Sequence, residues 1–117
     1  MKKLLMIVTS IALLSIFAGC SKKAAQKDFI LATGGTSGTY YPFGGAMAQV
    51  WNDGIEGMTV TAQATGASAE NLRLIGKSEA EFAIVQNDVM DYAYKGVDLF
   101  EGETVPNLAT IGTLYPE

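Results

Sequence analysis

The chain has 117 residues, no histidine and a single cysteine, and its 12 acidic and 8 basic residues give a formal net charge of −4 at pH 7. Five basic residues precede Asp28 but no acidic residue does, so the remainder carries about nine net negative charges and is a poor partner for nucleic acid. Without histidine, with one cysteine and with scattered acids, the sequence predicts no metal site and no cofactor.

The N-terminus reads as an export signal. A basic start, Met1–Lys3, precedes an apolar run over 4–18 that is too short for a stable membrane span. The run ends in Phe17-Ala18-Gly19-Cys20, which resembles the bacterial lipoprotein cleavage box, although leucine is usual where Phe17 stands. The resemblance implies that Cys20 becomes the lipidated N-terminus, that 21–28 is a tether, and that the protein is extracytoplasmic and membrane-anchored; the alternative is an ordinary signal with a chance cysteine.

A strand, a glycine-rich turn and a helix follow. The apolar run Phe29–Ala32 predicts a buried strand. Behind the turn, four apolar residues recur at helical spacing and predict one buried helix face: Phe43, Met47, Val50 and Trp51. Pro42 fits the first turn of that helix, where its missing N–H costs nothing.

The turn between them has the composition of an anion-binding site. Gly34, Gly35 and Gly38 let the backbone approach a ligand, and hydroxyls from Thr36, Ser37, Thr39 and Tyr40 add neutral donors at a helix N-terminus. No lysine lies between Lys27 and Lys77 and the glycine spacing is not G-x-G-x-x-G, so neither a P-loop nor a dinucleotide fingerprint is present. The alternative is a turn that only reverses the chain.

The remaining segments repeat this unit. Met58–Ala62 predicts a second strand, followed by a small-residue turn and a helix that points Leu72 and Ile75 inward. Ser68 lies in the region expected to cap that helix. A third strand is expected over 82–85, a third helix from Asn87 or Asp88 to about Gly96, an irregular loop over 97–106 and a fourth strand over 108–114.

Arg73 admits two interpretations. It could clamp a ligand carboxylate, but its helical phase favours an exposed position, paired with Lys77 on the outer side and with Glu70 as a neighbour.

The order βαβαβα followed by β predicts an α/β fold, a three-layer parallel sheet with helices on both faces. Ligands of such sheets bind beyond the carboxyl ends of the strands, where all three polar turns fall. The candidate ligand-binding residues are Thr36, Ser37, Gly38, Thr39 and Tyr40 in the first turn, Ala67, Ser68 and Asn71 in the second, and Gln86, Asn87 and Asp88 in the third. Two alternatives stay open: Tyr40 packs on the sheet, and Asn87 or Asp88 only caps its helix.

Four blocks resemble the TAXI solute-binding proteins, the substrate-binding subunits of one branch of the TRAP transporters. They are T-G-G-T-S-G-T-Y-Y-P-F-G-G at Thr33–Gly45, T-G-A-S-A-E-N-L-R-L at Thr65–Leu74, F-A-I-V-Q-N-D-V at Phe82–Val89 and A-T-I-G-T-L-Y-P-E at Ala109–Glu117. The resemblance implies a bilobed type II periplasmic-binding-protein fold that closes on a small carboxylate such as glutamate, glutamine or 2-oxoglutarate and delivers it to TRAP membrane permease subunits. Family members are several times longer than this body, so we expect 29–117 to be the N-terminal lobe of a truncated chain or fragment.

Other functions fit less well. An enzyme is not expected, because no histidine is present, Cys20 is assigned to lipid and no paired carboxylates lie at the turns. Two alternatives remain: an adhesive or immunogenic surface lipoprotein that binds no solute, and the substrate-binding lipoprotein of an ATP-driven importer.

Overall fold

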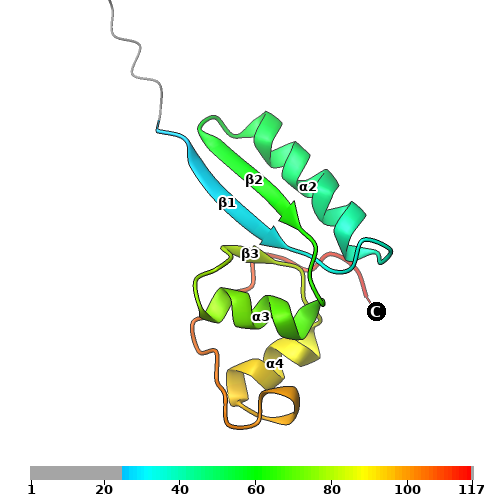
Figure 1. Ribbon diagram of the computed structural model, residues 1–117, viewed down its shortest axis with the longest axis vertical. Helices are drawn as coiled ribbons and strands as arrows, with labels where there is room; N and C mark the ends of the chain where they lie inside the picture. The colour runs from blue at the N-terminus through cyan, green and yellow to red at the C-terminus, as the bar shows by residue number, and fades with distance from the viewer. Residues whose placement is uncertain (1–24, 117) are drawn as a thin grey trace, which may run out of the picture.

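The computed structural model describes residues 25–116, which form an α/β unit (Figure 1). Its elements in chain order are β1 (Lys27–Ala32), α2 (Tyr40–Gly54), β2 (Met58–Gln63), α3 (Ser68–Gly76), β3 (Phe82–Ala83), α4 (Asn87–Lys95) and the 3₁₀ helix η2 (Asp98–Phe100). The predicted signal peptide and lipidated Cys20 lie outside the described residues. Lys27 and Asp28, which the sequence assigns to the tether, are the first residues of β1.

The three strands form one parallel sheet in the order β2-β1-β3. The strand β1 pairs along its whole length with β2, and only Leu31 and Ala32 pair with β3. Since β2 and β3 lie on opposite sides of β1, right-handed crossovers carry α2 and α3 to opposite faces. The predicted α/β class with a helix-flanked parallel sheet is thus confirmed.

The helix α2 packs on the sheet through two small buried residues and through Met47 and Trp51 of the predicted helix face, which lie partly buried against the core. Gly44 and Ala48 are its buried residues, and Ala48 joins Leu31, Val60 and Ile84 in one apolar core cluster. Two members of the predicted helix face point elsewhere: Val50 is 68% exposed and Phe43 is 39% exposed. The buried face is set by how closely the helix backbone approaches β1, which favours small side chains over large ones.

A second core cluster joins the later helices to the segment behind them. Leu72 of α3 and Val89 and Ala93 of α4 pack with Phe100 and Val105. The interval 97–106, expected to be an irregular loop, therefore contains η2 and two residues with at most 3% exposure.

Arg73 connects α3 to this segment. Its guanidinium donates to Glu103 Oε2 at 2.9 Å and to the Leu99 carbonyl at 2.7 Å, and it lies 4.6 Å from the centre of the Phe100 ring. Arg73 is partly exposed, as its helical phase predicts. The expected neighbours Lys77 and Glu70 are wrong, because residues 26 to 30 positions away in the sequence bind the side chain instead.

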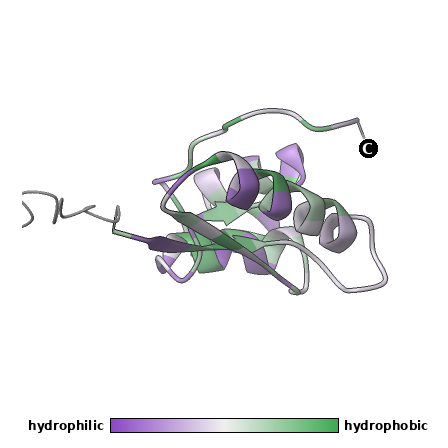
Figure 2. Ribbon diagram, turned by 90° about the horizontal axis from the view of Figure 1, so that it is seen from above, coloured by the Kyte–Doolittle hydropathy of each residue, from purple (hydrophilic) through white to green (hydrophobic). Residues whose placement is uncertain are grey.

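Two strand predictions need correction. The third strand is shorter than expected: β3 covers only Phe82–Ala83 of the predicted range 82–85. The interval 108–114 is not a strand; it runs as an extended trace along one side of the fold, and Ile111 is 80% exposed (Figure 2). A strand needs a hydrogen-bonded neighbour, and the described sheet ends at β3 without pairing to this segment.

The outer edge of β2 carries a side-chain clasp. Asn52, near the end of α2, accepts a hydrogen bond from the Val60 amide at 2.6 Å and donates one to the Val60 carbonyl at 3.0 Å. The carboxamide thus takes the place of a neighbouring peptide group at the middle of this edge strand.

Candidate functional site

The glycine-rich turn lies directly at the carboxyl end of β1. Thr33 and Gly34 are buried, whereas the turn over 35–39 is exposed and is closed by a hydrogen bond from the Gly38 amide to the Gly35 carbonyl at 2.9 Å. Thr39 is the N-cap residue of α2 but makes no side-chain cap, and the first turn of α2 contains no acidic residue. The positive end of the helix dipole is therefore not neutralised from within the helix.

Tyr40 begins α2, and its side chain packs against Gly34 of the glycine turn. A Cβ atom added to Gly34 would lie 3.2 Å from Tyr40 Cβ and within van der Waals reach of its ring. Glycine at this position thus allows the tyrosine to approach the backbone, and the ring forms part of the wall of the site.

The second turn is tied to the first through the backbone. The Thr65 amide donates to the Gly34 carbonyl at 3.2 Å. Ala67, with φ of 69°, lies in the left-handed region and is the N-cap residue of α3. Its amide is bound by Thr65 Oγ1 at 3.1 Å, and the Gly66 amide is bound by Glu70 Oε2 at 2.6 Å. The amides of Thr65, Gly66 and Ala67 are thus already paired within the protein.

Asn71 is fully buried and joins the ends of the strands. Its Nδ2 group donates to the carbonyl of Thr33 at 2.6 Å and to that of Ile84 at 2.8 Å, with a longer contact of 3.4 Å to Ala32. Its Oδ1 accepts from the Thr65 hydroxyl at 2.6 Å. The side chain therefore holds the ends of β1, β3 and the second turn in a fixed relation.

The third turn is connected to the second by Ser68. This buried hydroxyl oxygen accepts a hydrogen bond from the Gln86 amide at 2.9 Å. Gln86 is the N-cap residue of α4 without a side-chain cap, while Asn87 and Asp88 form its exposed first turn. The expected cap by Asn87 or Asp88 is wrong, since Asp88 Oδ1 accepts only from the adjacent Val89 amide. Ser68 does not cap α3 either, because it bonds to the third turn.

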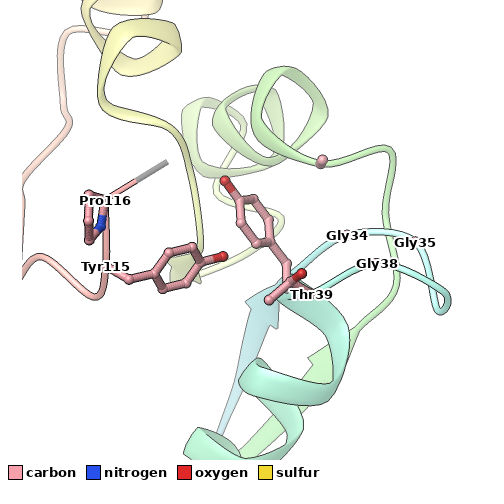
Figure 3. Close-up of a pocket in the computed structure, with 8 residues that line it drawn as sticks. Gly34, Gly35, Gly38, Thr39, Tyr115 and Pro116 are labelled. Carbon is pink, nitrogen blue, oxygen red and sulfur yellow. The ribbon is translucent and has the colours of Figure 1, made fainter.

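A cavity of about 400 Å³ opens between the first two turns and the end of the chain (Figure 3). It is lined by Gly34, Gly35, Gly38, Thr39, Tyr40, Ala67, Tyr115 and Pro116. Volumes of this size accommodate small organic ligands. The lining contains no charged side chain, so backbone amides, a threonine hydroxyl and the tyrosines supply its polar groups.

The structure brings together some of the sequence-predicted residues and separates others. Gly38, Thr39, Tyr40 and Ala67 line the cavity. Thr36 and Ser37 are exposed at the tip of the turn, Ser68 and Asn71 are buried in the hydrogen bonds described above, and the third-turn residues Gln86, Asn87 and Asp88 are exposed outside the lining.

Sequence reasoning missed Tyr115 and Pro116 as lining residues. They directly follow the interval 108–114, expected to form the fourth strand, and the chain here lies beside the start of α2 (Figure 1). The Tyr-Pro pair lies in the last of the four sequence blocks, Ala109–Glu117, but no spacing rule connects it to a turn more than seventy residues earlier. Only the path of the chain in space brings the two together.

Over residues 25–116, no three His, Cys, Asp or Glu side chains gather as a metal-binding group. Within the same range no helix has both the length and the apolar character needed to cross a membrane.

A comparison with protein-family models matches residues 31–117 to the NMT1-like family. The match begins within β1 and includes all three polar turns as well as the segment that carries Tyr115. It therefore covers the whole cavity and well over half of the chain. The chain belongs to the NMT1-like family, a family of periplasmic solute-binding proteins.

Proposed function

We propose that this protein is the extracytoplasmic solute receptor of a TRAP-type transporter of the TAXI branch, with a small carboxylate such as glutamate, glutamine or 2-oxoglutarate as its ligand. The observation that carries this proposal is the cavity beside the N-terminus of α2, whose lining offers glycine amides and hydroxyls and no charged side chain. Donors of this kind stabilise an anion through local dipoles, although the protein body is acidic.

The ligand carboxylate would lie against Gly34, Gly35 and Gly38, with Thr39 and Tyr40 beside it and Ala67 opposite. Thr36 and Ser37 would reach it from the tip of the turn. Ser68 and Asn71 would support the site by fixing its turns, and Gln86, Asn87 and Asp88 would contact the part of the ligand that projects from the cavity.

A further part of this proposal concerns assembly. Residues 29–117 would be the first lobe of a bilobed receptor, Cys20 would anchor it to the membrane through lipid, and TRAP permease subunits would receive the solute. Membrane fractionation checks the anchor: the mature protein should stay with membranes, and Cys20→Ser should release it. A Cys20→Ser protein that fractionates like the wild type would remove the anchor from the proposal.

The affinity of one lobe should be low. A Kd of 1 μM needs about −8 kcal/mol. The helix dipole supplies up to about 2 kcal/mol and each charge-assisted hydrogen bond about 1.5–3 kcal/mol, against association costs of at least about 4 kcal/mol. We therefore expect this chain alone to bind its ligand in the millimolar range, and tighter binding once a second lobe closes the cleft.

Amide nitrogen–proton correlation spectra test the proposal. Titration of the 117-residue chain with glutamate, glutamine and 2-oxoglutarate should shift the amides of Gly34, Gly35 and Gly38. Gly35→Ala should weaken the binding, because Gly35 borders the cavity and an added methyl group would obstruct the ligand there. The fold should be unaffected, since the methyl meets no protein atom within 4 Å. Gly45→Ala is the matched control: its methyl is equally unobstructed, but Gly45 is not a lining residue.

Two results would contradict the proposal. The first is a spectrum in which none of the three compounds moves the glycine-turn amides at concentrations well above millimolar. The second is a titration in which Gly35→Ala and Gly45→Ala bind with the affinity of the wild type, which would place the ligand elsewhere.

A further inference from the structure

The hydroxyl of Tyr115 is buried without a hydrogen-bond partner. Among the described residues that are not exposed, the Tyr115 Oη is the one side-chain nitrogen or oxygen atom that is both buried and without a hydrogen-bond partner. Buried polar groups are paired in the great majority of cases, because an unpaired one loses its hydrogen bonds to water and gains none in return. An orphaned hydroxyl beside a cavity therefore indicates a missing partner.

The position of the ring is well defined. Tyr115 lies edge-on to Phe43 of α2, with ring centroids 6.1 Å apart and an interplanar angle of 69°. Aromatic pairs favour this arrangement. The contact turns the hydroxyl toward the start of α2, where Thr39 lies (Figure 3). The ring is thus held in place while its polar end faces the cavity.

The surroundings of the hydroxyl select the chemistry of the missing partner. The cavity lining carries no anionic or cationic side chain. Among its glycines, the amide of Gly38 is bound to the Gly35 carbonyl, and the amides of Gly34 and Gly35 are the donors. A phenolic O–H is a donor as well, so donors from the glycine turn and from Tyr115 border the same space. The complementary group is an oxygen acceptor, and a carboxylate forms the strongest bonds with such donors.

We propose that Tyr115 is a ligand-binding residue whose hydroxyl donates a hydrogen bond to an oxygen of the bound carboxylate. This inference rests on the proposed solute-receptor function and adds a contact from the C-terminal segment to those of the polar turns. Amides of the glycine turn, which lies between β1 and α2, bind the ligand on one side, and Tyr115 binds it from the opposite wall of the cavity. Bound ligand thereby joins the irregular segment that ends at Tyr115 to the parallel sheet.

Tyr115→Phe tests the contact, because it removes the hydroxyl and keeps the ring that packs on Phe43. In the amide titration with 2-oxoglutarate, glutamate and glutamine, the variant should raise the Kd about tenfold or more, as expected for loss of a hydrogen bond to a charged acceptor. The matched control is Tyr94→Phe, which makes the same change at a side chain on α4 that is 60% exposed and should leave the Kd unchanged.

A second readout reports on the hydroxyl itself. In protein labelled with carbon-13 at tyrosine Cζ, the Tyr115 resonance, identified by its loss in Tyr115→Phe, should move on titration while the Tyr94 resonance stays in place. This shift depends on the hydroxyl environment and separates a direct contact from a purely structural role.

The outcomes distinguish this inference from the function on which it rests. Wild-type protein that shows no glycine-turn response to any of the three compounds overturns the receptor function and the contact together. If the wild type binds, the Kd of Tyr115→Phe is unchanged and the Tyr115 resonance stays in place, the contact alone is overturned. The partner of the Tyr115 hydroxyl is then an ordered water rather than the ligand.

Discussion

Gly44 of α2 has no room for a methyl group, and its neighbour Gly45 has ample room. A Cβ atom at Gly44 would overlap Thr33 Cγ2 and would lie 3.4 Å from Ile84 Cδ1 and from Leu31 Cδ2. At Gly45 no atom lies within 4 Å of the added carbon. The same substitution in adjacent residues of one helix should therefore have different effects on stability.

The size of the stability difference follows from two opposing effects, the higher helix propensity of alanine and the crowding caused by its methyl group. Replacing glycine by alanine inside a helix gains about 0.8–1.0 kcal/mol, and this gain applies at both positions. Inserting a methyl group into a packed core loses about 1–3 kcal/mol. Relief by rotation of Thr33 is blocked, because its hydroxyl donates to the Gln63 carbonyl at 2.6 Å. Gly45→Ala should stabilise the protein, and Gly44→Ala should be about 1–3 kcal/mol less stable than Gly45→Ala.

Urea unfolding followed by tryptophan fluorescence measures the difference. Trp51 is the single tryptophan of the chain and lies on α2 with its ring centroid 5.2 Å from that of Phe82, so its emission reports on the packing of this helix against the sheet. The comparison between the two variants cancels the helix-propensity gain and most of the change in the unfolded state. Similar slopes with different midpoints would indicate a change in stability alone.

A second substitution identifies the cause. Thr33→Ser keeps the hydroxyl and deletes the methyl that the new Cβ would overlap. The double variant Thr33→Ser/Gly44→Ala should recover much of the loss, with a coupling energy of about 1 kcal/mol between the two sites. The reasoning is refuted if Gly44→Ala and Gly45→Ala are equally stable, or if Thr33→Ser gives no recovery.

Three further changes test other contacts, each by urea unfolding. Asn71→Leu should destabilise the protein by about 3–5 kcal/mol, because it removes the hydrogen-bond partner of two buried carbonyls and of the partly buried Thr65 hydroxyl. A loss below about 1 kcal/mol would contradict the role of Asn71 in joining the strand ends. Gly96→Ala should lower the free energy of unfolding by about 2 kcal/mol or more, since φ is +70° and the new Cβ would lie 3.1 Å from the Glu103 carbonyl oxygen. Gly102 has φ of +78° but open space around it, so Gly102→Ala should lose less. Equal losses in the two variants would show that crowding has no part in the effect. Glu103→Gln should lose at most about 1 kcal/mol at low salt and less at high salt, because the partly exposed ion pair with Arg73 is screened by solvent; a larger loss that is independent of salt would contradict this account.

Local pattern predicts the first part of the sheet well. The apolar run at Phe29–Ala32 and the alternation at Met58–Ala62 fall within β1 and β2, and their order with the helices correctly gives a parallel sheet. These predictions succeed because each strand is recognised by side chains a few residues apart, and the connections allow parallel pairing alone.

The helix face is predicted less well, because size is a poor guide to burial where a helix approaches a sheet closely. Val50 is large and exposed, while Gly44 and Ala48 are small and buried. The neighbours predicted for Arg73 are wrong for another reason: its actual partners lie in a segment whose path the sequence does not reveal.

The candidate site likewise contains one part that the sequence predicts and one part that it does not. The glycine turn and Ala67 are recognisable from composition and from their position after predicted strands, and they do line the cavity together. The opposite wall, Tyr115 and Pro116, depends on the course of the interval 106–116, which has no regular structure to predict. The part of a site that is built from contiguous turns can be anticipated; the part supplied by a distant segment cannot.

The Asn52 clasp has a consequence for self-association. A bare edge strand offers alternating amides and carbonyls on which another chain can assemble. At Val60 both groups are occupied by the carboxamide of Asn52, so an incoming strand finds its docking ladder interrupted halfway along β2. The helix whose first residues border the cavity thus also covers part of the sheet edge at its other end, which disfavours strand pairing with another chain along β2.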